Sequence, residues 1–391
     1  MLFKIAFKNL LGAKLRTFLN VFVTSISFFM IIFVSGLYDG MRQHAKQVTI
    51  DTEIAGGAYW HPMYDPMDPL LFEDAHSTLP PEIKDLVQEK KAVPVLVSQA
   101  AIYPHGRIVP VVMKGIDPNQ NILNMPTEVL GKNKNTDIPV LIGREMASKT
   151  KLERGDSFTI RWLDTDGTYD ANEGTVVHIM DTENFKIDIG QIWVPIKKAQ
   201  EMLEMKNEVT YVSYAKEEKE VNDMGTWVHR DVDYLIQDIE AAIEADKPGN
   251  QIMFAILLCL AAIGIFNAQV LSIFRRGKEI GTLMALGMTR SKVVALFTME
   301  GGINAVLASA LTIFPFGIIL WWTAEYGIPM PIDYTEMGFL MATRLIPVYS
   351  MGLIVTTTIL VFVIVITVSY LPSRKISKMK PTDALRGKIV S

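Results

Sequence analysis

The sequence predicts a membrane protein with four transmembrane α-helices and a large α+β extracytoplasmic domain between spans one and two. Three features of its 391 residues predict this fold class. Four uncharged apolar runs are 22 to 29 residues long, and roughly 20 mostly apolar residues are enough for a helix to cross the hydrocarbon core. Basic residues concentrate in the short segments beside these runs, and acidic residues concentrate in the long segment between the first two.

These features divide the chain into segments of distinct character. We expect a cytoplasmic N-terminal basic helix at 1–16, transmembrane helices at 17–38, 251–274, 298–324 and 345–373, an extracytoplasmic domain at 39–250, a cytoplasmic segment at 275–297, an outer loop at 325–344 and a cytoplasmic tail at 374–391. An alternative interpretation of the first run is a cleaved signal peptide, because basic residues precede it. The run is longer than the apolar part of a signal peptide and no small-x-small cleavage site follows, which favours an uncleaved anchor.

The distribution of basic residues predicts the orientation of the chain in the membrane. Residues 1–16, 275–293 and 374–391 together hold fifteen lysines and arginines but only two acidic residues, Glu279 and Asp383. Cytoplasmic segments next to membrane spans are enriched in Lys and Arg, so we expect all three in the cytoplasm. Both termini then lie on one side, as four spans require, and the long acidic segment lies outside.

The outer segment, residues 39–250, holds 36 Asp and Glu against 22 Lys and Arg. The simplest interpretation is a soluble acidic surface; the alternatives are steering of a cationic partner and repulsion from anionic headgroups. Runs such as AVPVLVSQAAIYP and GTVVHIM predict strands, and shorter stretches such as IKKAQEMLEM predict helices. We expect an α+β domain in which residues 139–204 form an inserted subdomain on flanking base strands. The single cysteine, Cys259, lies in span two, so no disulfide is expected in this domain.

Both ends of the outer domain are predicted to be helical stalks. YDGMRQHAKQVTI continues span one, and the segment before span two places apolar residues on one helical stripe. That stripe consists of Leu235, Ile236, Ile239 and Ile243. Pro248–Gly249 is expected to break or kink the second stalk just before the membrane. The stripe is therefore our candidate for transmitting motion between the membrane and the outer domain.

The sequence contains none of the common enzyme signatures. It has no glycine-rich phosphate loop after a strand, no G-x-S-x-G, no H-E-x-x-H and no paired cysteines, so we expect no catalytic, metal-binding or cofactor-binding residues. The outer histidines lack ligand spacing and are expected to be structural or solvated: His61, His76, His105, His178 and His229. We interpret WHPMYDPMDP, which begins at Trp60, as an ordinary proline-rich loop. The alternative is an aromatic and methionine-rich loop that contacts an apolar ligand.

The basic segment RRGKEIGTLMALGMTRSKV, residues 275–293, also has an apolar pattern. Ile280, Leu283 and Met284 share one helical face, and Gly287 is placed to end that helix. Two interpretations stay open at this point. One is an amphipathic hairpin held at the membrane surface by lipid phosphates, and the other is a cytoplasmic knob that inserts into a partner.

Two residues of span three are candidates for a hinge at the membrane edge. Glu300 is expected to pair with Arg275, Arg276 or Arg290, because an acid at a membrane edge pairs with a nearby base or faces water. Pro315 is expected to kink the span because it removes a backbone donor.

The stretch RRGKEIGTLMALGMTRSKVVALFTMEG resembles the signature of the FtsX-like permeases, a family that includes the MacB exporters and the lipoprotein-releasing permeases. FKNLLGAKLRTFL before span one and KPTDALRG in the tail are similar to the two ends of that family. GIDP, VLIGREMASKTKLERGD and DIGQIWVPIKKAQEML are similar to its MacB-like periplasmic core domain. The resemblance covers essentially the whole chain, and it is closest to the LolC/LolE-type lipoprotein-releasing permeases.

This resemblance implies a non-catalytic permease subunit of an ABC transporter, multi-pass in the bacterial inner membrane. Such permeases form a homo- or heterodimer on two ATPase subunits, and the segment between spans two and three couples to the ATPase. Because this chain has no G-x-x-x-x-G-K-[ST], ATP is expected to be bound by a separate ABC ATPase chain, unlike in MacB, where the ATPase is fused to the permease. By position in the matching motif, the coupling residues are Lys278, Glu279, Ile280, Gly281, Leu283, Met284, Leu286 and Gly287.

The implied function is release of lipoproteins, or of other amphipathic cargo, from the inner membrane. A periplasmic adaptor or chaperone is a further candidate partner, and nucleic acid is not expected. The alternatives are MacB-like export of peptides or drugs with a periplasmic adaptor, and FtsX-like signalling across the membrane to a cell-wall hydrolase.

Overall fold

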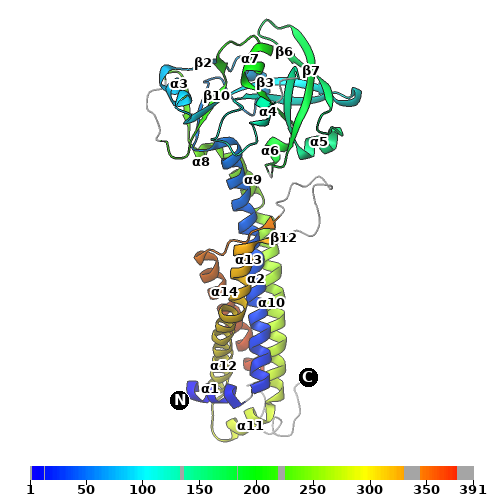
Figure 1. Ribbon diagram of the computed structural model, residues 1–391. Coiled ribbons are helices and arrows are strands. Elements are labelled where there is room, and N and C mark those ends of the chain that lie inside the picture. The colour runs from blue at the N-terminus through cyan, green and yellow to red at the C-terminus, as the bar shows by residue number, and fades with distance from the viewer. Residues whose placement is uncertain are drawn as a thin grey trace. The chain divides into compact units, whose positions relative to one another are not determined.

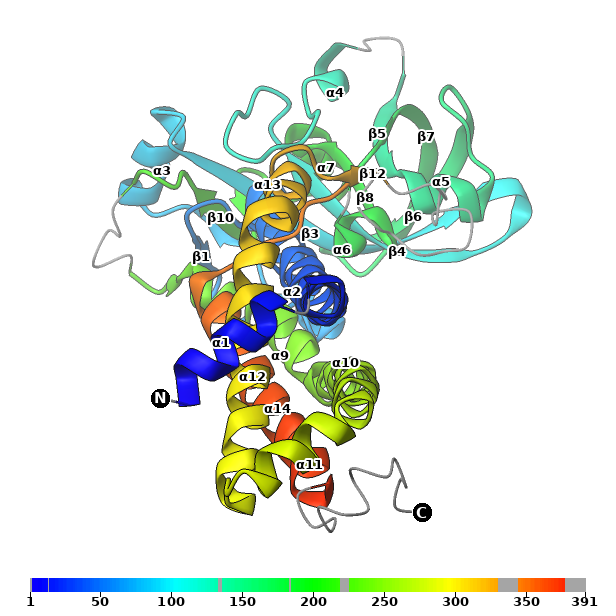
Figure 2. The same cartoon turned by 90° about the horizontal axis from the view of Figure 1, so that it is seen from below.

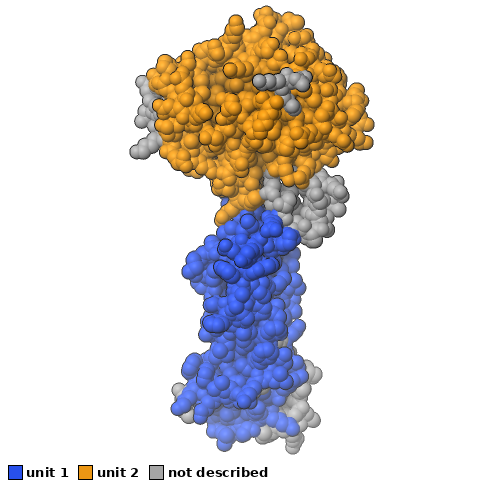
Figure 3. All heavy atoms as spheres, viewed as in Figure 1, with its two compact units in different colours: residues 1–42, 244–329, 344–391 blue, residues 43–243, 330–343 orange. Residues whose placement is uncertain are grey.

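The computed structural model of the chain describes residues 2–12, 14–132, 136–182, 184–218, 225–329 and 344–376. These residues form two compact units, coloured separately in Figure 3. The helical unit comprises the described residues within Met1–Arg42, Glu244–Pro329 and Arg344–Ser391, and the sheet unit comprises those within Gln43–Ile243. Most of the predicted outer loop and the KPTDALRG motif of the tail lie outside the described residues.

The helical unit contains the four predicted membrane spans (Figure 1). Its elements are α1 (Leu2–Gly12), the first part of α2 (Lys14–Thr49), α10 (Lys247–Arg275), α11 (Gly277–Ala285), α12 (Arg290–Leu311), a π-helical turn (Thr312–Phe316), α13 (Gly317–Tyr326), the strand pair β12 (Ile328–Pro329) and β13 (Arg344–Leu345), and α14 (Met351–Ile376). Among the described residues, four helical stretches are long and apolar enough to cross a membrane: Thr17–Ile54, Gln237–Asn267, Arg290–Tyr326 and Met351–Arg374. The number of spans predicted from the apolar runs is therefore confirmed.

The spans pack on one another through a shared apolar core. Phe28, Ile265, Ala305 and Val365 belong to this core and come from α2, α10, α12 and α14 respectively. Gly301 of α12 lies directly against α14, because a Cβ atom added there would come within 2.1 Å of the Ser369 hydroxyl. Small residues allow this kind of close helix approach in membranes.

Span three is interrupted where the sequence predicts a kink. Pro315 lies inside the π-helical turn Thr312–Phe316, which separates α12 from α13. Proline cannot donate the backbone hydrogen bond that a regular α-helix needs at this position, so the helical ladder is broken there. The Thr312 hydroxyl lies 2.9 Å from the Ser25 hydroxyl of α2, which ties this turn to span one.

The sheet unit is built on one mixed sheet. Among the described residues, nine strands follow the order β11-β1-β10-β3-β4-β8-β5-β7-β6. Their bounds are β1 (Ala58–Trp60), β3 (Ala92–Tyr103), β4 (Val109–Ile116), β5 (Ile138–Gly143), β6 (Ser157–Leu163), β7 (Tyr169–Met180), β8 (Gln191–Pro195), β10 (Tyr211–Tyr214) and β11 (Val228–Arg230), with β2 (Ser77–Thr78) paired to β9 (Glu208–Val209) apart from them. Two neighbouring pairs, β4 with β8 and β5 with β7, are parallel.

Part of this sheet closes on itself, because β6 also pairs with β3. Short helical elements flank the strands: a π-helical turn (Ile50–Ile54), two 3₁₀ turns (Pro69–Glu73 and Pro104–Gly106), α3 (Pro81–Gln88), α4 (Val129–Lys132), α5 (Arg144–Thr150), α6 (Phe185–Asp188) and α7 (Ile196–Met202). β5 is buried along its whole length, and its residues supply two cores. Ile138, Val140 and Ile142 belong to one core and Leu141 to the other, as the alternation of side chains along a strand requires.

Residues 139–204, expected to form an inserted subdomain, share this sheet with their flanking strands. β8 lies inside that range and pairs in parallel with β4, which lies before it in the chain. β6 also lies inside the range and pairs with β3. Strand pairing depends on which backbone edges meet in space, so the alternating pattern within each strand predicted the strands but not their partners.

Candidate functional site

A buried arginine organises the segment between spans two and three. Arg276 lies at the break between α10 and α11 and is almost completely buried. Its Nη1 donates to Oε2 of Glu300 at 2.5 Å, and its Nε donates to Oε2 of Glu279 at 2.6 Å. The guanidinium also lies over the ring of Phe297, 4.8 Å from its centre. Of the three arginines expected as candidate partners of Glu300, the structure selects Arg276.

Glu300 joins three elements through its two carboxylate oxygens. Oε2 accepts from Arg276 at the α10–α11 break, and Oε1 accepts from the Nδ2 amide of Asn9 at 2.9 Å. Asn9 belongs to α1, which packs against α12 and crosses it in Figure 2. A buried charge is tolerated only when its partners satisfy it. This cluster of Asn9, Arg276, Glu279 and Glu300, here called the Glu300 cluster, therefore holds α1, α11 and α12 together at one end of the helical unit (Figure 1).

The apolar face of α11 packs largely inside the protein. Ile280 is 1% exposed and forms a small core with Val293 and Phe297 of α12, and Met284 packs against that core. Gly281 is also buried, and Leu283 is half-buried. Gly287 ends the helical turn with a φ of +95°, a conformation that glycine adopts without strain. Thr289 then caps α12 by accepting from the backbone N–H of Lys292.

The remaining predicted coupling residues face outward. Lys278 and Glu279 are exposed, and Leu286 is 80% exposed at the end of the helix. The predicted coupling residues are thus divided into two sets. Ile280, Gly281 and Met284 hold α11 on α12, whereas Lys278, Glu279 and Leu286 are available at the surface.

The predicted stalk stripe lies on two helices rather than one. α8 (Val232–Leu235) and α9 (Gln237–Ala245) are separated at Ile236, and a second interruption at Asp246 precedes α10, close to the expected break at Pro248–Gly249. Ile236 is buried, and the other three residues of the stripe are half-buried. On α9, Glu240 forms an ion pair with Lys46, which lies near the end of α2.

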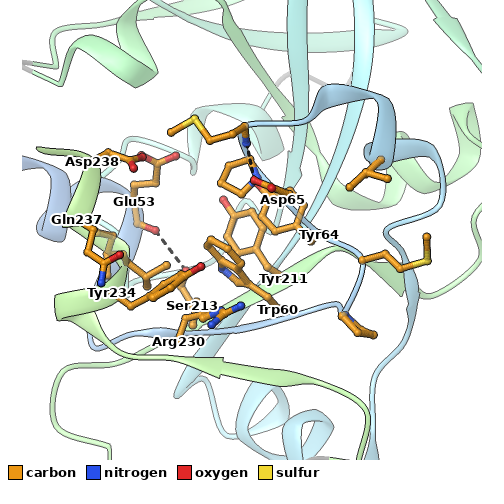
Figure 4. Close-up of a pocket in the computed structure, with 18 of the residues that line it drawn as sticks. Glu53, Trp60, Tyr64, Asp65, Tyr211, Ser213, Arg230, Tyr234, Gln237 and Asp238 are labelled. Carbon is orange, nitrogen blue, oxygen red and sulfur yellow. Dashed lines mark hydrogen bonds between the residues drawn. The ribbon is translucent and has the colours of Figure 1, made fainter. Parts of the chain in front are cut away.

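The sheet unit contains a cavity of about 510 Å³ that the sequence indicated only in part. Its wall includes Trp60, Met63, Tyr64 and Met67 of the WHPMYDPMDP stretch. Figure 4 shows the residues from elsewhere in the chain that complete the wall, including Glu53, Tyr211, Arg230, Tyr234 and Asp238. No local pattern links these residues, because they come from a helical turn, two strands and two helices that are distant in sequence.

Comparison with known proteins identifies the permease portion of the chain. Residues 251–381 match the family model described as FtsX-like permease C-terminal. Over these residues the chain is an FtsX-like permease. The predicted family is thereby confirmed, and the matched residues include the Arg276–Glu300 pair and the whole of α11.

Two relatives of this permease are named as ABC transporter proteins. An uncharacterized ABC transporter permease of Methanocaldococcus jannaschii is 33% identical over 133 residues, which are 34% of this chain and 31% of the relative. The macrolide export ATP-binding/permease protein MacB of Escherichia coli K12 is 24% identical over 203 residues, which are 50% of this chain and 28% of MacB. The matches therefore span about a third or less of the length of these relatives.

Among solved structures, the permease is similar to an extracellular domain of a transporter. The domain belongs to the noncanonic ABC-type transporter YknZ from Gram-positive bacteria. The match covers 42% of this chain and 83% of the YknZ domain, with 13% sequence identity. The TM-score of 0.26 is too low to carry an argument about this chain.

Proposed function

We propose that this permease is the non-catalytic membrane subunit of an ABC transporter and receives the motion of a separate ATPase through the exposed surface of α11. The observation that carries the proposal is the division of α11 into two faces. Ile280 is buried against α12, whereas Leu286 at the end of α11 is 80% exposed and Lys278 is exposed at its beginning. This exposed leucine is available to a partner protein, because the buried core of a protein interface is more apolar than its rim.

The Glu300 cluster supports this proposal because it makes α11 a firm attachment point. A partner that pushes on α11 acts on Arg276 and, through Glu300, on α12 and α1. The core of Ile280, Val293 and Phe297 supplies a second connection to α12. Displacement of α11 is therefore passed to span three rather than absorbed by a loose loop.

The experiment compares two leucines of equal exposure. Leu286 is 80% exposed and Leu70, in a 3₁₀ turn of the sheet unit, is 79% exposed. We expect the Leu286→Asp variant to insert into the membrane normally. It should no longer co-purify with the ABC ATPase or stimulate ATP hydrolysis by that ATPase, because a carboxylate in a protein interface is desolvated without a partner. Leu70→Asp carries the same change outside the proposed interface and should behave as wild type. Retention of ATPase binding and stimulation by Leu286→Asp would exclude this surface as the docking site.

For the cargo, we propose lipoproteins released from the inner membrane of a bacterium, with residues 39–250 outside. The support is the similarity of GIDP and the neighbouring motifs to lipoprotein-releasing permeases. MacB-like export remains the second candidate, supported by the similarity to a macrolide export protein over half of the chain. Depletion of the permease should make lipoproteins accumulate in the inner membrane. Normal lipoprotein sorting together with sensitivity to an exported drug would favour the second candidate.

A further inference from the structure

Helix α1 has an exposed apolar stripe. Phe3, Phe7 and Leu11 recur at every fourth position and therefore share one side of the helix. These three residues are 60%, 44% and 61% exposed. Ala6 and Leu10, on another side of the helix, are buried, and α1 packs against α12. The helix thus buries one apolar face within the protein and leaves a second one exposed.

Lysines flank this stripe on the side away from the buried face. Lys4 and Lys8 directly follow Phe3 and Phe7, and both are exposed. Successive residues of an α-helix are turned by about 100°, so the buried face, the apolar stripe and the lysines follow one another around the helix. The chain has no acidic residue before Asp39. The exposed surface of α1 therefore combines apolar side chains with positive charge and contains no acidic residue.

The position of α1 is that of a helix lying in the surface of a bilayer. Its 11 residues make a helix about 16 Å long, which is too short to cross the hydrocarbon core. The helix runs across α12 instead of along it (Figures 1 and 2). The first membrane span follows within α2, and the Thr17 hydroxyl of α2 donates to the Leu10 carbonyl of α1 at 2.7 Å. This bond holds the end of α1 beside the start of span one.

Two observations favour lipid over a partner protein as the cover of this stripe. Exposed apolar residues continue along the chain into span one, beginning with Leu15 and Phe18, which are both more than half exposed. The lysines complement the phosphates of anionic lipids, and long lysine side chains reach the headgroups from the edge of the hydrocarbon. Amphipathic helices with lysines beside a large apolar face bind at the membrane interface.

We propose that α1 binds the surface of the bilayer and recognises anionic phospholipids. Phe3, Phe7 and Leu11 lie at the boundary between the headgroups and the acyl chains. Lys4 and Lys8 contact the lipid phosphates. The inference requires that the chain spans a membrane. It does not depend on the docking of an ATPase on α11, nor on the side of the membrane on which α1 lies.

Bound lipid acts on the Glu300 cluster through Asn9. The Nδ2 amide of Asn9, on the same helix as the stripe, donates to Oε1 of Glu300 at 2.9 Å. The attachment of α1 to the bilayer is thereby connected to α12. A ligand that binds only the folded state stabilises that state. Anionic lipid on α1 should therefore raise the temperature at which the protein unfolds.

Spin labels on the full chain in lipid nanodiscs test whether the stripe faces lipid. In a Cys259→Ser background, one variant carries a nitroxide on Phe7→Cys and the control carries it on Gln88→Cys, at an exposed position of α3. Oxygen concentrates in lipid and a nickel chelate stays in water. The label at position 7 should collide mainly with oxygen, and the label at position 88 mainly with the chelate.

Two results of this experiment would overturn the proposal. Collisions mainly with the chelate at position 7 would mean that the stripe faces water. Few collisions with either reagent at position 7 would mean that protein, such as a second copy of this chain, covers the stripe.

Thermal unfolding tests the recognition of anionic lipid. The full chain is placed at low salt in nanodiscs of phosphatidylcholine, alone or mixed with phosphatidylglycerol of the same acyl chains, and unfolding is followed by circular dichroism. We expect phosphatidylglycerol to raise the midpoint of the wild type. Lys4→Gln with Lys8→Gln should lose most of this rise, because each lysine near an anionic surface strengthens binding roughly fivefold.

The matched control is Lys84→Gln with Lys197→Gln, which makes the same change of charge at exposed positions of α3 and α7 in the sheet unit. This control should keep the full rise in the midpoint. The absence of a rise in the wild type would contradict the recognition of anionic lipid. An equal rise in the Lys4 and Lys8 variant and in the control would show that the lipid acts elsewhere than on α1.

Discussion

At the scale of single residues, the most informative group is Arg276, because it bonds two carboxylates in different surroundings. The side chain of Glu300 is 8% exposed and that of Glu279 is 60% exposed. Water and salt screen an exposed pair, so it contributes little. A buried pair is different, because removing one partner leaves the other charge unsatisfied where water cannot reach it. The two bonds of one guanidinium thus allow a comparison within a single site.

We predict that Glu300→Ala destabilises the protein by about 3–5 kcal/mol, because it leaves Arg276 buried and Asn9 without its acceptor. Glu279→Ala removes a bond of similar length and should cost ~0–1 kcal/mol. Thermal unfolding in nanodiscs, followed by circular dichroism, measures both losses. Equal losses would mean that Glu300 is hydrated in the membrane-embedded protein and that the cluster does not hold α1 and α11.

At the scale of elements, the segment α8–α9 connects the sheet unit to α10 along the chain. Ile236 is buried, but Ile239 and Ile243 are only half-buried. Asp231 caps α8 by accepting from the backbone of Tyr234, and the helix then breaks at Ile236. The segment is therefore two short helices separated by one residue, Ile236. Its role as a lever stays a prediction that depends on how firmly these half-buried side chains pack.

We predict that Ile239→Ala with Ile243→Ala lowers cargo release while ATP hydrolysis persists, because the connection is softened. Half-burial places the loss of stability for each residue below the ~2–5 kcal/mol of a fully buried isoleucine. The matched control is Ile252→Ala with Ile256→Ala, which has the same spacing on exposed positions of α10. ATPase rate, transport and protein level are measured together. Normal transport at normal abundance would remove α9 from the mechanism.

At the scale of the whole molecule, the segregation of charge predicts how the chain crosses the membrane. The four helical stretches provide the spans, and the basic segments beside them favour the cytoplasmic side. Residues 39–250 and 275–297 should then lie on opposite sides. This arrangement is a property of the whole chain, since each span reverses the side of the next connection.

We predict that cysteines at Thr168 and Ser291, introduced in a Cys259→Ser background, react with an impermeant maleimide from opposite sides. Both positions are exposed, Thr168 before β7 and Ser291 at the start of α12. In intact spheroplasts, only the cysteine at position 168 should be labelled, and lysis should make the cysteine at position 291 reactive. Labelling of both before lysis would overturn the four-span topology.

The sequence by itself determined the number of spans, the α+β character of the domain after span one and the family. Each of these depends on information carried locally in the chain. The length of an apolar run decides whether a helix can cross the hydrocarbon core, and alternation along a strand decides which face is buried. The motif around α11 is likewise continuous in sequence, and the FtsX-like match over residues 251–381 includes it.

Only the tertiary structure decided which distant residues meet. It selected Arg276 from three candidate partners of Glu300 and added Asn9 from α1. It also divided the predicted coupling residues into a buried side at Ile280 and an exposed residue at Leu286. The closure of the sheet by β3 and β6, and the meeting of Trp60 with Arg230, follow the same rule. Such contacts depend on the free energy of packing the complete chain, and no short stretch of sequence contains both partners.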